Sequence, residues 1–138
     1  FQVSYYERSL WSSTQSVSAA SGGTIDFDLV AGSDRAGDTY LLLGSTGNSP
    51  GFFYGSTHIP LNPDFYFTIT LNGAGGALYP GTVGSLDGTG NGSAAFNLPA
   101  GAATPLIGST IYHAYAALDP GTLAATHASD AEPLLIEP

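Results

Sequence analysis

Apolar and polar side chains alternate along much of this chain, and this alternation is typical of half-buried β-strands. The clearest alternation runs from Phe65 to Leu71, where four large apolar residues are separated by Tyr and Thr. An NPD sequence at 62–64 precedes it and an NG sequence at 72–73 follows it, and both are common in turns. The pattern therefore predicts a strand, and bulk on both of its faces favours a central position in a sheet.

Other segments show the same alternation or a short apolar run. We expect strands at Phe1–Leu10, Thr24–Val30, Thr39–Leu43, Gly81–Leu86, Ser93–Leu98, Ser109–Leu118, Thr122–Ala128 and Pro133–Ile136, and a short strand or an exposed aromatic loop at Gly51–Tyr54. No segment of about ten residues or more has a helical repeat, and turn signals recur about every ten residues. The sequence predicts an all-β fold: an antiparallel β-sandwich, immunoglobulin-like or jelly-roll-like, with Greek-key crossings.

The first predicted strand is amphipathic and lies at the very start of the chain. Phe1, Val3 and Tyr5 share one face, and Gln2 and Ser4 lie on the other. An extended stretch of ten residues reaches about 30 Å, enough to cover the edge of a small sandwich. We therefore divide the chain into an extension at 1–11, a candidate donor strand, and a single sandwich domain at 12–138. The extension either folds back on its own sandwich or pairs with a neighbouring copy.

Composition narrows the classes of partner. The 138 residues suit one domain, only 9% of them are charged, and the formal net charge is −9. Arg8 and Arg35 are the only basic residues besides histidine, so nucleic acid is excluded as a partner and anionic membranes are disfavoured. No stretch has the roughly 20 apolar residues of a membrane span, and the absence of cysteine excludes disulfides and thiol chemistry. A start at Phe1 and the lack of lysine favour a secreted, extracellular protein.

The histidines and serines form no recognisable catalytic or metal-binding pattern. A metal site needs His58, His113 and His127 to converge with a carboxylate such as Asp64 or Asp130, and no HxH or HxxxH pairing occurs. His113 lies within a predicted strand, which favours a hydrogen-bonded core histidine. The GxSxG sequence of a nucleophile elbow does not occur either. We therefore predict no catalytic residue, metal or cofactor, and a protein that is not an enzyme.

Two further features have both a functional and a structural interpretation. Asp26 and Asp28 share one strand face about 7 Å apart, which suits a carboxylate pair or a Ca²⁺ site but is also typical of a solvent-facing surface. The DGTGNG sequence at 87–92 lacks the later Glu of a calcium loop and predicts a hairpin-type turn. The aromatic residues that could form a sugar-stacking platform are Trp11, Phe52, Phe53, Tyr54 and Tyr79.

From Asp38 onward the chain resembles a β-sandwich domain found in secreted proteins of planctomycetes, myxobacteria and related bacteria, where it often forms the C-terminal part of a larger protein. The resemblance covers about two thirds of the chain, at Thr39–Pro50, Ile59–Thr70, Gly84–Leu98, Ile111–Pro120 and Ser129–Pro138. It implies a fold and no activity. This chain differs in carrying the N-terminal extension in place of a preceding domain.

These observations favour a structural subunit of an extracellular, pilus-like fibre, assembled head to tail from copies of itself by N-terminal strand complementation. The predicted subunit-interface residues are Phe1, Val3, Tyr5, Tyr6, Leu10 and Trp11. Two alternatives stay open: a secreted carbohydrate-binding or adhesion module, for which surface glycans are the partner, and a C-terminal sorting or anchoring domain of a larger secreted protein.

Overall fold

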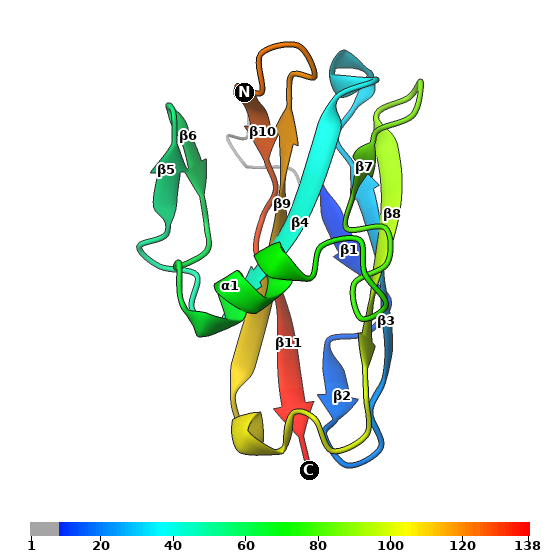
Figure 1. The fold of residues 1–138 in the computed structure, drawn as a ribbon, viewed down its shortest axis with the longest axis vertical. Helices are drawn as coiled ribbons and strands as arrows, with labels where there is room; N and C mark the ends of the chain where they lie inside the picture. The colour runs from blue at the N-terminus through cyan, green and yellow to red at the C-terminus, as the bar shows by residue number, and fades with distance from the viewer. Residues whose placement is uncertain (1–8) are drawn as a thin grey trace, which may run out of the picture.

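The structure, a computed structural model, describes residues 9–138 (Figure 1). Phe1, Val3, Tyr5 and Tyr6 of the predicted interface lie outside the described residues. The strands are β1 (Leu10–Ser12), β2 (Ser16–Ser18), β3 (Gly23–Val30), β4 (Thr39–Ser45), β5 (Phe52–Tyr54), β6 (Thr57–Ile59), β7 (Val83–Ser85), β8 (Asn91–Leu98), β9 (Thr110–Leu118), β10 (Ala125–Ala128) and β11 (Glu132–Glu137). One α-helix, α1 (Phe65–Asn72), and two 3-10 turns, η1 (Ser33–Arg35) and η2 (Thr104–Leu106), complete the described elements.

The strands form a two-sheet sandwich with a separate hairpin. One sheet has the order β1-β3-β8, and the larger sheet has the order β2-β11-β9-β4-β7, with β10 also paired to β9. β5 and β6 pair only with each other in a hairpin beside the larger sheet. This arrangement confirms the predicted all-β sandwich. We predicted an antiparallel sandwich, and one pairing differs from this prediction: β2 pairs with β11 in parallel.

The strand order is that of an immunoglobulin-like sandwich rather than a jelly roll. In immunoglobulin domains strands A, B and E share one sheet, and strands C, F and G share the other. Here β1, β3 and β8 form the first set, and β4, β9 and β11 form the second, in the same chain order. The chain crosses between the sheets from β3 to β4 and from β8 to β9, which are the Greek-key crossings expected from the sequence.

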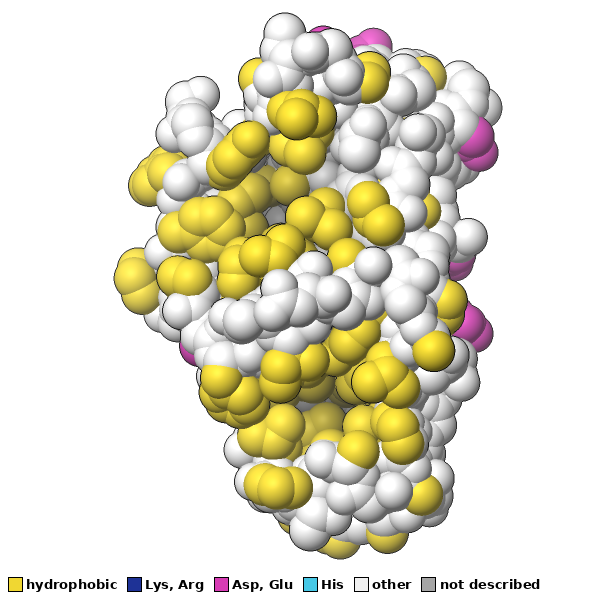
Figure 2. All heavy atoms as spheres, viewed as in Figure 1, with side chains coloured by type: hydrophobic (Ala, Val, Ile, Leu, Met, Phe, Trp, Pro, Cys, Tyr) yellow, Lys and Arg dark blue, Asp and Glu magenta, His cyan; other side chains and the backbone are white. Residues whose placement is uncertain are grey.

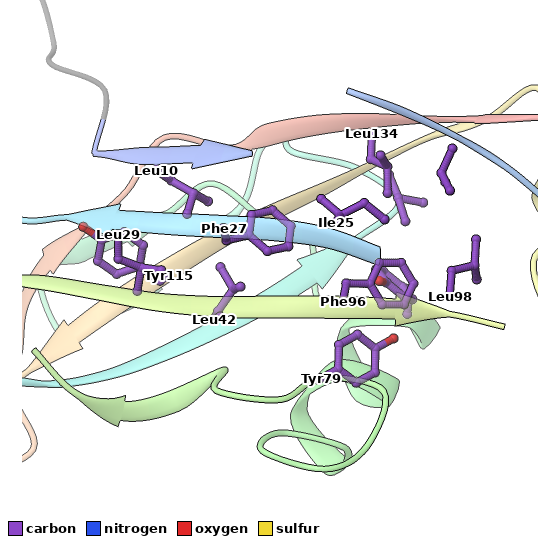
Figure 3. Packing of buried hydrophobic residues seen from close by; sticks show 14 of the residues in the cluster. Leu10, Ile25, Phe27, Leu29, Leu42, Tyr79, Phe96, Leu98, Tyr115 and Leu134 are labelled. Atoms are coloured by element: carbon purple, nitrogen blue, oxygen red, sulfur yellow. The ribbon is translucent and has the colours of Figure 1, made fainter. Parts of the chain in front are cut away.

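Alternation places the core between the two sheets. Ile25, Phe27 and Leu29 of β3 point inward as predicted and pack with Phe96 of β8 and Tyr115 of β9 (Figure 3). A smaller cluster lies on the outer face of the larger sheet, formed by Leu43, Ile59, Leu61 and Ala114. β4 therefore buries side chains on both of its faces, in agreement with its continuous apolar run.

The prediction of a strand at 65–71 is wrong, because these residues form α1. Asp64 caps the helix: one carboxylate oxygen accepts a hydrogen bond from the backbone N–H of Phe67 (3.0 Å). Its second oxygen accepts hydrogen bonds from the Thr46 N–H (2.9 Å) and the Ser45 hydroxyl (2.9 Å) at the end of β4. The NPD sequence therefore opens a helix, and Asp64 fixes that helix to the larger sheet.

The predicted turn at 87–92 is present, but it joins strands of different sheets. β7 pairs with β4, whereas β8 pairs with β3, so the turn does not close a hairpin. One Asp87 carboxylate oxygen accepts hydrogen bonds from the backbone N–H groups of Thr89 and Asn91 and from the Thr89 hydroxyl. These bonds lower the pKa of Asp87 and give the carboxylate a role in stabilising the turn.

Candidate functional site

Helix α1 lies across the outside of the sandwich and separates two apolar hollows (Figures 1 and 2). Tyr66 and Thr70 are buried and hold the helix to the sandwich. Phe65 and Ile69 lie on one flank of the helix, and Phe67 and Leu71 lie on the other. The alternation that resembles a strand in the sequence thus divides its large residues between the two hollows.

The first hollow, which we call the α1–η2 hollow, has a volume of about 280 Å³. Its wall includes Phe65, Ile69 and Leu78, which are 59%, 47% and 43% exposed. Its floor includes Phe96 of β8 and Ile111 of β9, both members of the main core. The hollow is therefore an opening from the surface into the space between the two sheets.

The second hollow, the α1–hairpin hollow, has a volume of about 300 Å³ and lies on the outer face of the larger sheet. Leu41 and Ala116 contribute to its floor, Phe52 and Tyr54 come from the β5–β6 hairpin, and Leu71 comes from α1. Among residues 9–138, all side chains that line either hollow are apolar or aromatic. Figure 2 shows both as yellow depressions on one face, on either side of the helix.

Polar contacts hold Ser9 and Leu10 against the segment around β10. The backbone N–H of Ser9 donates to Oδ1 of Asp130 (2.9 Å), and the N–H of Leu10 donates to the same oxygen (3.3 Å). The Ser9 hydroxyl lies 3.0 Å from Nε2 of His127, whose pKa is lowered by burial and by Arg35. We call these contacts of Ser9 with Asp130 and His127 the Ser9 anchor, because they join the residue before β1 to β10 and to the segment that follows β10.

The two described residues of the predicted interface have different positions. Leu10 is fully buried in the core of its own sandwich, because β1 pairs with β3. Trp11, on the opposite face of β1, is 45% exposed. β1 is therefore part of the smaller sheet, and Leu10 packs within its own sandwich.

The three histidines singled out in the sequence do not converge on one site, although His127 and Asp130 both contact Ser9. His113 is buried, and its Nε2 lies 2.8 Å from the Tyr66 hydroxyl, which confirms the predicted hydrogen-bonded core histidine. His58 lies in the hairpin, where Nε2 is 2.7 Å from the Pro50 carbonyl. Asp26 and Asp28 are both exposed on the outer face of β3. Within residues 9–138, no three His, Cys, Asp or Glu side chains gather into a group that could hold a metal ion.

The aromatic residues considered for sugar stacking do not form one platform. Phe52 and Tyr54 line the α1–hairpin hollow, whereas Phe53 is 68% exposed and contacts the ring of His58. Tyr79 is buried and stacked on Phe96 (ring centroids 5.1 Å apart), and Trp11 lies on β1 in the other sheet. The structure therefore distributes these five side chains over at least three separate places.

The sequence indicates neither the two hollows nor the contacts that anchor Ser9. The hollows depend on α1, whose large residues alternate as in a strand. The NPD sequence was the one available signal, since Asp is a preferred helix N-cap. The anchor joins Ser9 to Asp130, which are 121 positions apart in the chain, so no local pattern indicates it.

Comparisons with known proteins find matches among solved structures alone. No protein-family model matches the chain, and no curated protein matches it. Among solved structures, the chain is similar to the crystal structure of the E. coli chaperone DraB, with 14% sequence identity and a TM-score of 0.48. The match covers 95% of this chain and 56% of that chain, so this chain spans about half the length of that structure. In the described part of the chain, no helix has the length and apolar character needed to cross a membrane.

Proposed function

We propose that this protein is a structural subunit of an extracellular, pilus-like fibre, in which the N-terminal segment of each copy complements the sandwich of the next. The observation that carries the proposal is the exposed apolar face around α1. Phe65, Ile69, Leu71 and Leu78 are each more than 40% exposed beside two apolar hollows. A contiguous apolar surface of this kind usually marks an interaction site.

The segment before Ser9 has the chemistry that such a surface accepts. Phe1, Val3 and Tyr5 recur at every second position, so an extended segment presents them on one face. Glu7 and Arg8 carry opposite charges, which leaves the segment with no net charge. In the part of the chain that the structure describes, no charged side chain lines either hollow. The segment can therefore bury its apolar face there without burying an unpaired charge.

The proposed role is structural and not enzymatic, and its proposed place is outside the cell. A lysine-free chain with only two arginines and a net charge of −9 suits a secreted protein that meets no nucleic acid. The partner in this proposal is another copy of the same chain. Each copy both donates a segment and receives one, and a head-to-tail contact of this kind does not close on itself.

Electron microscopy and size-exclusion chromatography of the full-length protein test the proposal. We expect filaments from the full chain, and monomers or amorphous aggregates after deletion of Phe1–Glu7. Val3→Asp should also prevent assembly, because it places a charge on the apolar face of the segment. Ser4→Asp is the matched control, since Ser4 lies on the opposite face, and it should assemble. Filaments formed equally well by the deletion variant would refute the proposal.

A further inference from the structure

We infer that the acceptor of the N-terminal segment is the α1–η2 hollow, and that its occupant is the segment Phe1–Arg8 of a second copy. This inference rests on the proposed fibre function and deepens it. It assigns an acceptor surface, which the sequence does not indicate, and chooses between the two hollows beside α1.

The first argument is the depth of the hollow. Phe96, Ile111 and Ile136 reach its floor from β8, β9 and β11, so both sheets contribute to it. All three residues belong to the main core. Apolar side chains inserted here would extend that core, whereas the α1–hairpin hollow lies over the small cluster outside the larger sheet. Side chains inserted in the α1–η2 hollow would contact core residues of both sheets, and this continuity with the main core favours it as the acceptor.

The second argument is the position of the anchor relative to the hollow. Ser9 lies at the end of β3, where its carbonyl accepts a hydrogen bond from the Val30 N–H (2.8 Å). Leu98, in the wall of the hollow, pairs with Gly23 at the start of β3. β1 and β8 also flank β3 on opposite sides. Ser9 and Leu98 therefore lie at opposite ends and on opposite edges of the smaller sheet.

This diagonal arrangement favours a second copy as the acceptor. The length of β3 separates Ser9 from Leu98 by about 20 Å, and the route around the sandwich adds about 10 Å or more. The eight residues before Ser9 span only about 26 Å when fully extended. A segment that leaves at one end and is received at the other also joins copies head to tail, which gives a fibre and not a closed dimer.

The third argument is the fit. The volume of about 280 Å³ lies just below the range of about 300–1,000 Å³ usual for small-molecule pockets, and it suits a few protein side chains. The outer edge of β8 is already partly covered, because Ala95 and Asn97 donate backbone hydrogen bonds to the carbonyls of Pro80 and Leu78. The segment would therefore be held mainly by Phe1, Val3 and Tyr5, and less by pairing with β8.

Disulfide cross-linking can test the assignment directly, because the chain contains no cysteine. One preparation carries Val3→Cys, a second carries Ala102→Cys in the wall of the α1–η2 hollow, and the two are mixed, assembled and oxidised. We expect a disulfide-linked dimer on a non-reducing gel. Ala116→Cys, in the floor of the α1–hairpin hollow, is the matched acceptor control, and Ser4→Cys is the matched donor control. Both controls should give little cross-linked product.

A blocking variant provides a second readout. Ala102→Trp adds bulk at an exposed position in the hollow, so it should leave the circular dichroism spectrum unchanged and abolish filaments. Ala36→Trp adds the same bulk at an exposed position that lines neither hollow, and it should assemble normally.

The two hypotheses fail in different ways. Filaments that cross-link through Ala116→Cys, or that form from the Ala102→Trp variant, would overturn the assignment of the α1–η2 hollow and leave the fibre function standing. A full-length protein that forms no filaments under any condition would overturn both.

Discussion

His113 occupies an aromatic cage at the centre of the sandwich. Phe27, Tyr66 and Phe96 contact its ring, and the Tyr66 hydroxyl is 2.8 Å from Nε2. Burial lowers the pKa of His113 to about 3, so the imidazole is neutral in the folded protein at any pH above that value. In the unfolded chain the same side chain takes up a proton below about pH 6.5.

The stability of the fold should therefore fall as the pH decreases from about 6.5 towards 3. Over this range the unfolded chain binds a proton that the folded protein does not, and at pH 5 the difference amounts to about 2 kcal/mol. Urea unfolding at pH 7.5 and pH 5 measures the loss. His113→Gln should lose about 2 kcal/mol less between the two pH values than the unmodified protein. Equal losses would mean that His113 is not held neutral by burial.

Asp64 shows how one carboxylate can join a helix to a sheet. Burial alone would raise its pKa, but hydrogen bonds from Thr46, Phe67 and Ser45 outweigh that effect and lower it. Asp64→Ala should reduce the free energy of unfolding by about 2 kcal/mol, at the upper end of helix-cap effects. Asp64→Asn should cost less, because one cap oxygen remains.

Denaturant melts at neutral pH measure these losses, with Asp28→Ala on the exposed face of β3 as the control. Because the pKa of Asp64 is lowered in the fold, its contribution is complete above about pH 3.8 and disappears as the pH falls through the lower, folded value. An Asp64→Ala variant as stable as the unmodified protein would show that the cap does not hold α1.

At the scale of elements, close packing of α1 against β4 should leave no room at Gly44. A Cβ atom added there would collide with the ring of Tyr66 and lie 3.0 Å from the ring of His113. Gly44→Ala should therefore destabilise the protein by about 1–3 kcal/mol, as overpacked cores do. Gly88→Ala is the matched control, since nothing lies within 4 Å of its added Cβ, and it should change stability by less than about 0.5 kcal/mol. Thermal melts showing equal effects would contradict this packing.

The sequence predicted those elements whose burial follows a simple period. β3 alternates strictly between buried and exposed residues, and β9 is a long apolar run in the centre of the larger sheet. α1 was missed because its apolar residues surround it. One side of the helix packs on the core and both flanks line hollows. Its apolar residues therefore do not form a single stripe with the helical repeat, and Thr68 is one of its exposed polar residues.

The candidate site was harder to predict than the fold because it depends on long-range packing. The alternation of Phe1, Val3 and Tyr5 predicts a segment that binds an apolar surface, but it does not indicate which surface. Leu10, at an even position, does not continue this alternation, and it belongs to the core of its own sandwich. The contacts of Ser9 with Asp130 and His127 join residues more than 110 positions apart in the chain, so no local pattern could indicate them.

At the scale of the whole molecule, charge would oppose the proposed assembly. Each copy of the chain carries a formal net charge of −9, and the proposed fibre would place these charges close together. Like charges repel over about 10 Å at 0.1 M salt and over longer distances in dilute buffer. Acidic side chains lie at the margins of the face that carries the hollows, so they need not be buried when that face is covered (Figure 2). Cohesion must then come either from apolar contacts or from bound cations.

The two sources of cohesion predict opposite responses to a chelator. A cation route needs carboxylates such as Asp26, Asp28, Asp34 and Asp38 to gather, yet the metal-binding groups of residues 9–138 form no cluster of three. Asp38 instead accepts a hydrogen bond from the Thr126 hydroxyl (2.7 Å). We therefore expect fibres in dilute buffer to persist when EDTA is added, as judged by light scattering and microscopy. Dissolution by EDTA, followed by reassembly with added Ca²⁺ but not with an equal ionic strength of NaCl, would show that cations hold the subunits together.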